Sequence, residues 1–273
     1  MDKPAAYIHR GFDRVEFFDF PDLNSLNQGI LKLKQEGREK ISLHVPGVRP
    51  SWFNYSGVTC FFLSEDKEKR DLSFKLLEDT LQLAKELKAC HAVCHLTYGP
   101  TDSKDNALAH GLASDSTARM AALSQTYGVS LDIEFAAYTD SFNLPADFIE
   151  AITPHPELGI CLDTGHAFLG AQKRSRDFYN DVKILAPRIR SMHLWNAIDN
   201  DTNKILGHIP LHPSQANNTQ YIDFTRVFNI LATAKCDPKV IFEYPLSQIT
   251  PEIQAGYDWI ETIITASKGQ SKQ

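Results

Sequence analysis

The stretch Ile160-Cys-Leu-Asp-Thr-Gly-His-Ala167 gives the clearest indication of the fold. It begins with a short apolar run and turns polar at an aspartate, which is typical of a buried strand. Side chains alternate along a strand, so Ile160 and Leu162 fall on one face and Cys161 and Asp163 on the other. We expect the first face to pack against helices and the second to point inward, with Asp163 at the strand end.

Six further segments have a similar form, a few apolar or β-branched residues that in most cases end in a polar residue. They span residues 14–18, 41–44, 92–95, 130–134, 190–193 and 240–243. Long gaps separate the segments, and a crossover to a parallel neighbour needs about a dozen or more residues. The spacing therefore leaves room for a helix between successive strands.

Helical patterns fill these gaps. Leu72 to Leu87 carry one apolar stripe, with Ser64 as the expected cap, and residues 107–127 form a second helix that ends at Gly128. Shorter helices are expected over 182–185, 224–231 and 253–264. Alternating strands and helices predict a parallel α/β sheet with right-handed crossovers.

A TIM-type (β/α) barrel is favoured over a doubly wound sheet. No glycine-rich nucleotide loop follows the first strand, and most strands end in polar residues. Only seven strands are convincing, so the first strand–helix unit is predicted to be missing or reduced, with residues 5–9 as an alternative stub strand. We expect a single domain over residues 1–273, with residues 267–273 as a disordered tail.

Composition narrows the class of protein. The chain has 273 residues, of which 42% are hydrophobic and 10% aromatic, so a large core rather than disorder is expected. No apolar run reaches the ~18 residues of a membrane span, the N-terminus lacks a signal sequence, and the five cysteines form no disulfide pattern. A cytoplasmic location is predicted.

The net charge of −6 argues against a general nucleic-acid binder, although it does not exclude a local basic groove. The oligomeric state is also open, a homo-oligomer included.

Polar residues at or just after the strands point to a metal site. They are His44, His95, Glu134, Asp163, His166, His193 and Glu243. Mixed imidazole and carboxylate donors suit Zn²⁺, Mn²⁺, Fe²⁺ or Co²⁺. Buried carboxylates that converge without a cation would repel one another and be costly to desolvate. The pattern therefore predicts a divalent metal at the carboxyl ends of the strands.

Several motifs together resemble a known superfamily. They are Gly-Phe-Asp-Arg-Val-Glu (11–16), Ile160 to Ala167, Ser191-Met-His-Leu194, Gly207-His-Ile-Pro-Leu211 with Ile222-Asp-Phe224, and Ile241-Phe-Glu-Tyr-Pro245. Residues 11–260 resemble the xylose-isomerase-like TIM-barrel superfamily, which includes sugar-phosphate isomerases and epimerases and the endonuclease IV-type apurinic-site nucleases. Of these motifs, Leu-Asp-Thr-Gly-His is the most specific.

The resemblance implies a main metal held by Glu134, Asp163, His193 and Glu243. Glu134 and Glu243 would also act as acid and base, and His166 would bind a substrate hydroxyl or polarise the carbonyl. The leading hypothesis is thus a divalent-metal-dependent isomerase or epimerase that uses Zn, Mn, Co or Mg. Its substrate would be a small carbohydrate: a sugar, a sugar phosphate or a polyol-derived ketone.

Further residues have two readings each. His44 and His95 would bind a second metal or the substrate, and His208 is a substrate-binding candidate. Tyr98 and Trp195 follow metal-capable strands and would stack on a sugar, or else pack over the barrel rim.

Two other functions stay open at this stage. The nuclease branch would add a metal at His44, His95 and Glu134, and a third at His166, His208 and an aspartate at the position of Leu206. The leucine removes one ligand of that third ion. The other alternative is a barrel that binds a metal or ligand without turnover.

Overall fold

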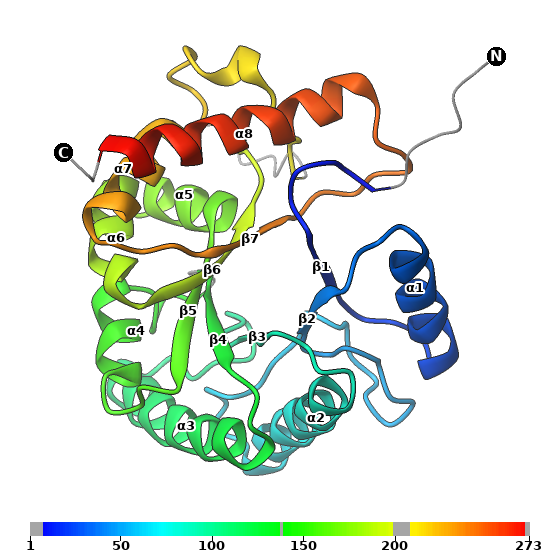
Figure 1. Ribbon diagram of the computed structural model, residues 1–273. Helices are drawn as coiled ribbons and strands as arrows, with labels where there is room; N and C mark the ends of the chain where they lie inside the picture. The colour runs from blue at the N-terminus through cyan, green and yellow to red at the C-terminus, as the bar shows by residue number, and fades with distance from the viewer. Residues whose placement is uncertain (1–7, 137–138, 199–207, 271–273) are drawn as a thin grey trace. The chain divides into compact units, whose positions relative to one another are not determined.

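The computed structural model describes residues 8–136, 139–198 and 208–270, in which strands and helices alternate along the chain (Figure 1). The strands are β1 (Arg14–Phe17), β2 (Lys40–His44), β3 (Ala92–His95), β4 (Leu131–Phe135), β5 (Leu158–Asp163), β6 (Ile189–Leu194) and β7 (Lys239–Phe242). The helices are α1 (Leu23–Gln35), α2 (Lys67–Glu86), α3 (Asn106–Tyr127), α4 (Pro145–Ile152), α5 (Thr164–Lys173), α6 (Phe178–Leu185), α7 (Phe224–Thr233) and α8 (Pro251–Gln270).

The seven strands follow one another in the sheet in chain order. The pairings of β1 with β2, β2 with β3, β3 with β4 and β6 with β7 are all parallel. The predicted strand–helix alternation and the seven strands are therefore confirmed. The predicted bounds of β3 agree with the structure, and those of the other strands differ by one or two residues. Because β7 ends at Phe242, Glu243 is the first residue after its strand.

Contacts divide the chain into two compact units. The N-terminal unit is Arg14–Cys161, and the C-terminal unit combines Leu162–Gln273 with Met1–Asp13. The division falls inside β5, so the strand that carries Asp163 belongs to both. The single domain stays a prediction.

The N-terminal unit is a parallel sheet with helices packed on its outer side. Figure 1 shows α1 beside β1 and β2, and its apolar stripe of Leu26, Ile30 and Leu33 is buried. The predicted cap of α2 is wrong: Asp66, not Ser64, accepts hydrogen bonds from the backbone N–H groups of the first turn. The Ser64 hydroxyl instead accepts a hydrogen bond from the backbone N–H of Asp66, the residue before the helix. Gly128 ends α3 with a left-handed φ of 68°, as predicted.

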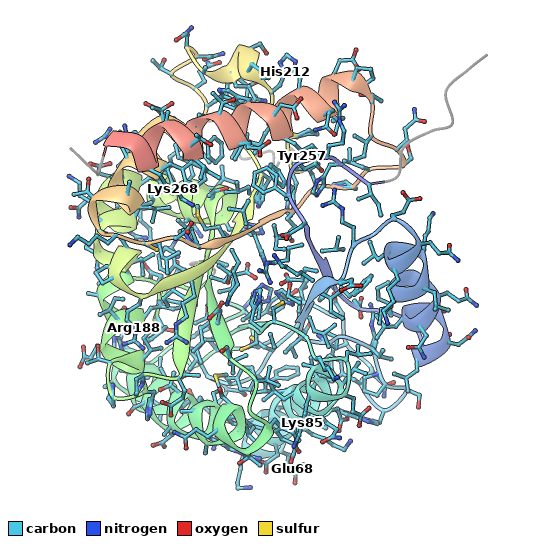
Figure 2. All side chains as sticks on the ribbon, viewed as in Figure 1. Glu68, Lys85, Arg188, His212, Tyr257 and Lys268 are labelled. Atoms are coloured by element: carbon cyan, nitrogen blue, oxygen red, sulfur yellow. The ribbon has the colours of Figure 1, made fainter. Side chains whose placement is uncertain are left out.

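In the C-terminal unit, residues before β1 pack against β7 and α8. His9 stacks on Tyr257 with ring centroids 4.2 Å apart, and Phe12 meets Phe242 edge-on at 4.8 Å. Figure 2 shows Tyr257 on α8, and Figure 1 shows the chain ahead of β1. The described residues ahead of β1, 8–13, contain no strand and no helix. Residues 8 and 9 are not in a strand, and residues 5–7 of the alternative stub strand lie outside the described residues.

The C-terminal end of the chain corrects another prediction. Residues 267–270, assigned to a disordered tail, belong to α8, and the Ser267 side chain is buried. The buried face of the helix, with Ile260 and Ile263, continues to Ser267 one turn later, although the sequence there is polar. Residues 271–273 lie outside the described residues. Within the described part of the chain, no helix combines the length and apolar character that a membrane crossing requires.

Candidate metal centre and active site

The N-terminal unit brings three predicted site residues together at the ends of β2, β3 and β4. His44 Nε2 lies 2.9 Å and His95 Nε2 lies 3.0 Å from the same carboxylate oxygen, Glu134 Oε2. All three side chains are buried, and their potential ligand atoms lie within 4.8 Å of one another. The parallel register explains the meeting, because His95 and Glu134 are direct partners between β3 and β4. The structure therefore brings these three residues into one cluster, and its use as a second metal or substrate site stays a prediction.

The other nitrogen of each imidazole faces a backbone carbonyl. His44 Nδ1 lies 2.9 Å from Val45 O, and His95 Nδ1 lies 3.3 Å from Val58 O. A carbonyl only accepts, so each Nδ1 carries the proton and, in the neutral ring, each Nε2 carries the lone pair. Two such lone pairs and a carboxylate directed at one point fit a cation. Metal-binding histidines commonly donate their other N–H in this way.

The neighbouring thiol does not add to the donor set. Cys94 precedes His95 on β3 and is buried. Burial, and to a smaller extent the nearby carboxylate of Glu134, raise the pKa of this thiol well above its usual value. Side chains alternate along a strand, so Cys94 and His95 lie on opposite faces of β3. The available donors in this cluster are nitrogen and oxygen, which suits a borderline or hard divalent ion.

The loop after β3 carries Tyr98 and is organised by a buried carboxylate. Asp102 accepts hydrogen bonds from the backbone N–H groups of Tyr98 and Gly99, each at 3.2 Å. Burial raises the pKa of Asp102 to about 6. Tyr98 itself is half-buried, so its predicted substrate contact stays a prediction.

The C-terminal unit holds Asp163 through both of its carboxylate oxygens. Oδ1 accepts from the backbone N–H of His166 at 2.7 Å, which caps α5. Oδ2 accepts from the indole Nε1–H of Trp195 at 2.9 Å. The Asp163 side chain is fully buried, so these two donors fix its direction.

The two residues after Asp163 explain the rest of the Leu-Asp-Thr-Gly-His motif. The Thr164 hydroxyl lies 3.1 Å from His193 O and 2.9 Å from Trp195 O, which joins the start of α5 to the end of β6. A Cβ on Gly165 would lie 2.3 Å from ring atoms of Trp195. Only glycine lets the indole approach the helix this closely, so the motif carries a packing requirement as well as a ligand.

His193 and Glu243 meet within the same unit. His193 Nδ1 lies 3.0 Å from Glu243 Oε2. The histidine side chain is buried, whereas that of Glu243 is 42% exposed although its Oε2 atom is buried. His208 Nδ1 lies 2.7 Å from the Glu243 backbone carbonyl and donates to it. The predicted ligands His193 and Glu243 therefore form a contact pair.

The histidines of the motif form an aromatic group with Trp195. The Trp195 indole stacks on His208 with ring centroids 4.0 Å apart and an angle of 11°. His166 meets both rings edge-on, at 4.9 and 5.4 Å. Trp195 is 0% exposed, which favours the packing alternative, and its predicted stacking on a sugar stays a prediction. The indole N–H donates to the buried carboxylate of Asp163, and the ring is buried together with it.

One aromatic residue beside the cluster does not stand out in the sequence. Phe18 follows β1, is 39% exposed and meets the His44 ring edge-on at 4.9 Å. Phe17, beside it, is buried. Alternation along the strand could have separated this Phe-Phe pair into an inner and an outer residue.

Comparison with known proteins places the chain in a family. A sequence profile described as xylose isomerase-like TIM barrel matches residues 5–263. The chain belongs to this family. Its strand–helix alternation is therefore that of a TIM barrel, as predicted, with seven strands in the described residues. Comparison with curated protein sequences gives no significant match.

Solved structures share the fold at low sequence identity. A D-tagatose 3-epimerase-like protein has a TM-score of 0.71 and 16% identity, covering 96% of this chain and 91% of its own. An L-ribulose 3-epimerase has a TM-score of 0.62 and 15% identity, covering 95% of each chain. A xylose isomerase-like TIM barrel protein from Mycobacterium smegmatis, in complex with magnesium, has a TM-score of 0.58 and 15% identity, covering 94% of this chain and 85% of its own. At this identity the likeness concerns the fold.

Proposed function

We propose that this protein is a divalent-metal-dependent isomerase or epimerase of a sugar or sugar phosphate. One observation carries the proposal: imidazole and carboxylate groups gather at the carboxyl ends of the parallel strands in both units. This is the end at which TIM barrels place their chemistry. The epimerases among the similar structures support the reaction class, and the magnesium-bound family member supports the use of a divalent ion.

The donor set fits the metal that the family implies. The proposed ligands of the main metal are those that the family resemblance implies, Glu134, Asp163, His193 and Glu243. His44 and His95 hold a second ion or contact the substrate. A bound Zn, Mn, Co or Mg ion would stabilise the negative charge that develops on substrate oxygens when a neighbouring carbon loses its proton.

The chain's own residues divide the remaining work. Glu134 and Glu243 act as the base that removes a carbon-bound proton and the acid that returns one. The partial exposure of the Glu243 side chain suits a group that must meet an incoming substrate. His166 and His208, both half-buried and 5.4 Å apart by ring centroids, are proposed to hold substrate hydroxyl or carbonyl oxygens.

The test is proton exchange in heavy water. The metal-loaded protein is incubated in D₂O with a panel of ketoses and ketose phosphates, and loss of the C3 and C1 proton signals is followed by NMR. We expect exchange and epimer formation with at least one substrate. Glu134→Gln and Glu243→Gln should each lower the exchange rate by about 10²- to 10⁴-fold, because each removes a proton-transfer group.

Glu150→Gln is the matched control, since Glu150 is an exposed glutamate on α4. It should exchange at the wild-type rate. Failure of every ketose and ketose phosphate to exchange in the metal-loaded wild-type protein would contradict the proposed function.

One observation favours a second candidate, a metal-dependent phosphodiester hydrolase. The contact between His166 and His208, and the His44–His95–Glu134 cluster, are the groups that the nuclease branch would use for additional ions. Leu206, at the position of the missing ligand, lies outside the described residues. Cleavage of abasic DNA without exchange of any ketose proton would favour this hydrolase. Metal binding with neither activity would favour the non-catalytic alternative.

A further inference from the structure

Trp195 is the residue of the candidate site that the proposed reaction does not use. It follows β6 directly and is fully buried. Its indole N–H donates to Asp163, its ring stacks on His208, and His208 in turn donates to the backbone carbonyl of Glu243. One side chain thus connects the residue that ends β5 with the residue that follows β7.

The surroundings of Trp195 restrict its movement. The Thr164 hydroxyl lies 3.3 Å from its backbone N and 2.9 Å from its backbone O. Gly165 leaves no space between the helix and the ring. The next residue, Asn196, pairs with Ile209 through two backbone hydrogen bonds of 2.9 and 3.1 Å, which places His208 beside the indole. The indole therefore has one well-defined direction in which to donate.

We propose that Trp195 is a positioning residue that acts through Asp163. The indole N–H holds Oδ2, while the start of α5 holds Oδ1, so the plane of the carboxylate keeps a fixed direction. The stack on His208 extends this alignment to the backbone of Glu243. The inference rests on the proposed function, because Asp163 and Glu243 are ligands in it.

The main test is metal affinity. Trp195→Phe keeps an aromatic ring over His208 and removes the N–H, so it should weaken binding of Co²⁺ or Mn²⁺ by about 10- to 100-fold, the usual effect of losing a hydrogen-bond partner of a ligand. Affinity is measured by competition with a chromophoric chelator. The matched control is Trp259→Phe, a half-buried tryptophan on α8 whose ring neighbours Phe224. It should bind the metal as the wild type does.

A double-mutant cycle distinguishes positioning from packing. If Trp195 acts through Asp163, then Trp195→Phe should cost less metal affinity in an Asp163→Asn background than in the wild-type protein. A packing defect would cost the same in both backgrounds. Equal losses would therefore overturn the proposal.

A measurement on the wild-type protein covers the case in which Trp195→Phe does not fold. The indole N–H signal of Trp195 is assigned in ¹⁵N-labelled protein from the spectra of Trp52→Phe and Trp259→Phe. We expect it to shift on addition of Zn²⁺ or Mg²⁺, whereas the signals of Trp52 and Trp259 stay in place. A wild-type protein that binds no metal would overturn the proposed function together with this inference. Metal binding with an unmoved Trp195 signal, or with equal affinity in Trp195→Phe, would overturn the inference alone.

Discussion

The two groups of site residues are built in different ways. In the N-terminal unit, His44 and His95 contact Glu134 directly, and backbone carbonyls fix both rings. In the C-terminal unit, a tryptophan and the start of a helix fix Asp163. The first group needs only neighbouring parallel strands in the correct register. The second needs three segments, around Asp163, Trp195 and His208, to pack closely. The second group should therefore be far more sensitive to changes that leave every ligand in place.

Gly165→Ala should give the largest effect of this kind. The added methyl group would meet ring atoms of Trp195 at 2.3 Å, and overpacking of this type costs about 1–3 kcal/mol. We expect a lower free energy of unfolding in urea and a weaker metal affinity, since Trp195 must move.

Gly111→Ala is the control for Gly165→Ala. Gly111 lies in α3 of the N-terminal unit, where a Cβ would meet no atom within 4 Å. This variant should be more stable by about 0.5–1 kcal/mol, because alanine favours helix. A Gly165→Ala protein as stable and as tightly metal-bound as wild type would remove the proposed difference between the groups.

Thr164→Val should give an intermediate effect. Valine has nearly the same shape but lacks the hydroxyl that serves the carbonyls of His193 and Trp195, so about 1–2 kcal/mol of stability should be lost. Thr164→Ser keeps the hydroxyl and should lose less. The measurement is the free energy of unfolding in urea of the wild type, Thr164→Val and Thr164→Ser. A serine variant as unstable as the valine variant would show that the methyl group, and not the hydroxyl, joins α5 to β6.

Asp102 should give the smallest effect, in the N-terminal unit. Burial raises its pKa to about 6, above the usual value of 3.8. The folded state thus holds a proton that the unfolded state has already lost, so stability is present at low pH and falls as pH rises through 6. Between pH 5 and 6 the wild type should lose about 1 kcal/mol relative to Asp102→Asn.

This comparison is made by urea unfolding at both pH values. The asparagine keeps an acceptor for Tyr98 and Gly99, so the loop contacts are retained. Parallel pH profiles of the two proteins would show that another group is responsible.

Much of the fold could be predicted from strand ends. Short apolar runs, most of them closed by a polar residue, located all seven strands, because the period of two and the long gaps are local signals. Helix starts were harder. Ser64 and Asp66 are both good caps, and the choice depends on which backbone N–H groups the chain presents. The tail was misassigned because the polar composition of residues 267–270 hides a continuing helix.

The candidate site was predictable in its residues but not in its supports. His44, His95 and Glu134 meet because their strands are neighbours, which the order of the segments already indicates. The burial of Trp195 and its hydrogen bond to Asp163 depend on contacts between segments that are 32 residues apart in the chain. No local pattern reports such a contact. The small size of Gly165 was visible in the motif, but its reason appears only with the indole beside it.

Asp163 has a structural role as well as a proposed role in metal binding, so its presence in a related sequence has two explanations. Its carboxylate closes the first turn of α5 and is also a proposed metal ligand. A related protein without catalytic activity would still be selected to keep this aspartate, because α5 would otherwise lose its N-cap. Retention of the residue is therefore weak proof of activity among relatives. Glu243, which lies outside any helix start and is partly exposed, has no such second reason to persist, and its loss is the more informative sign that a lineage has stopped turning over substrate.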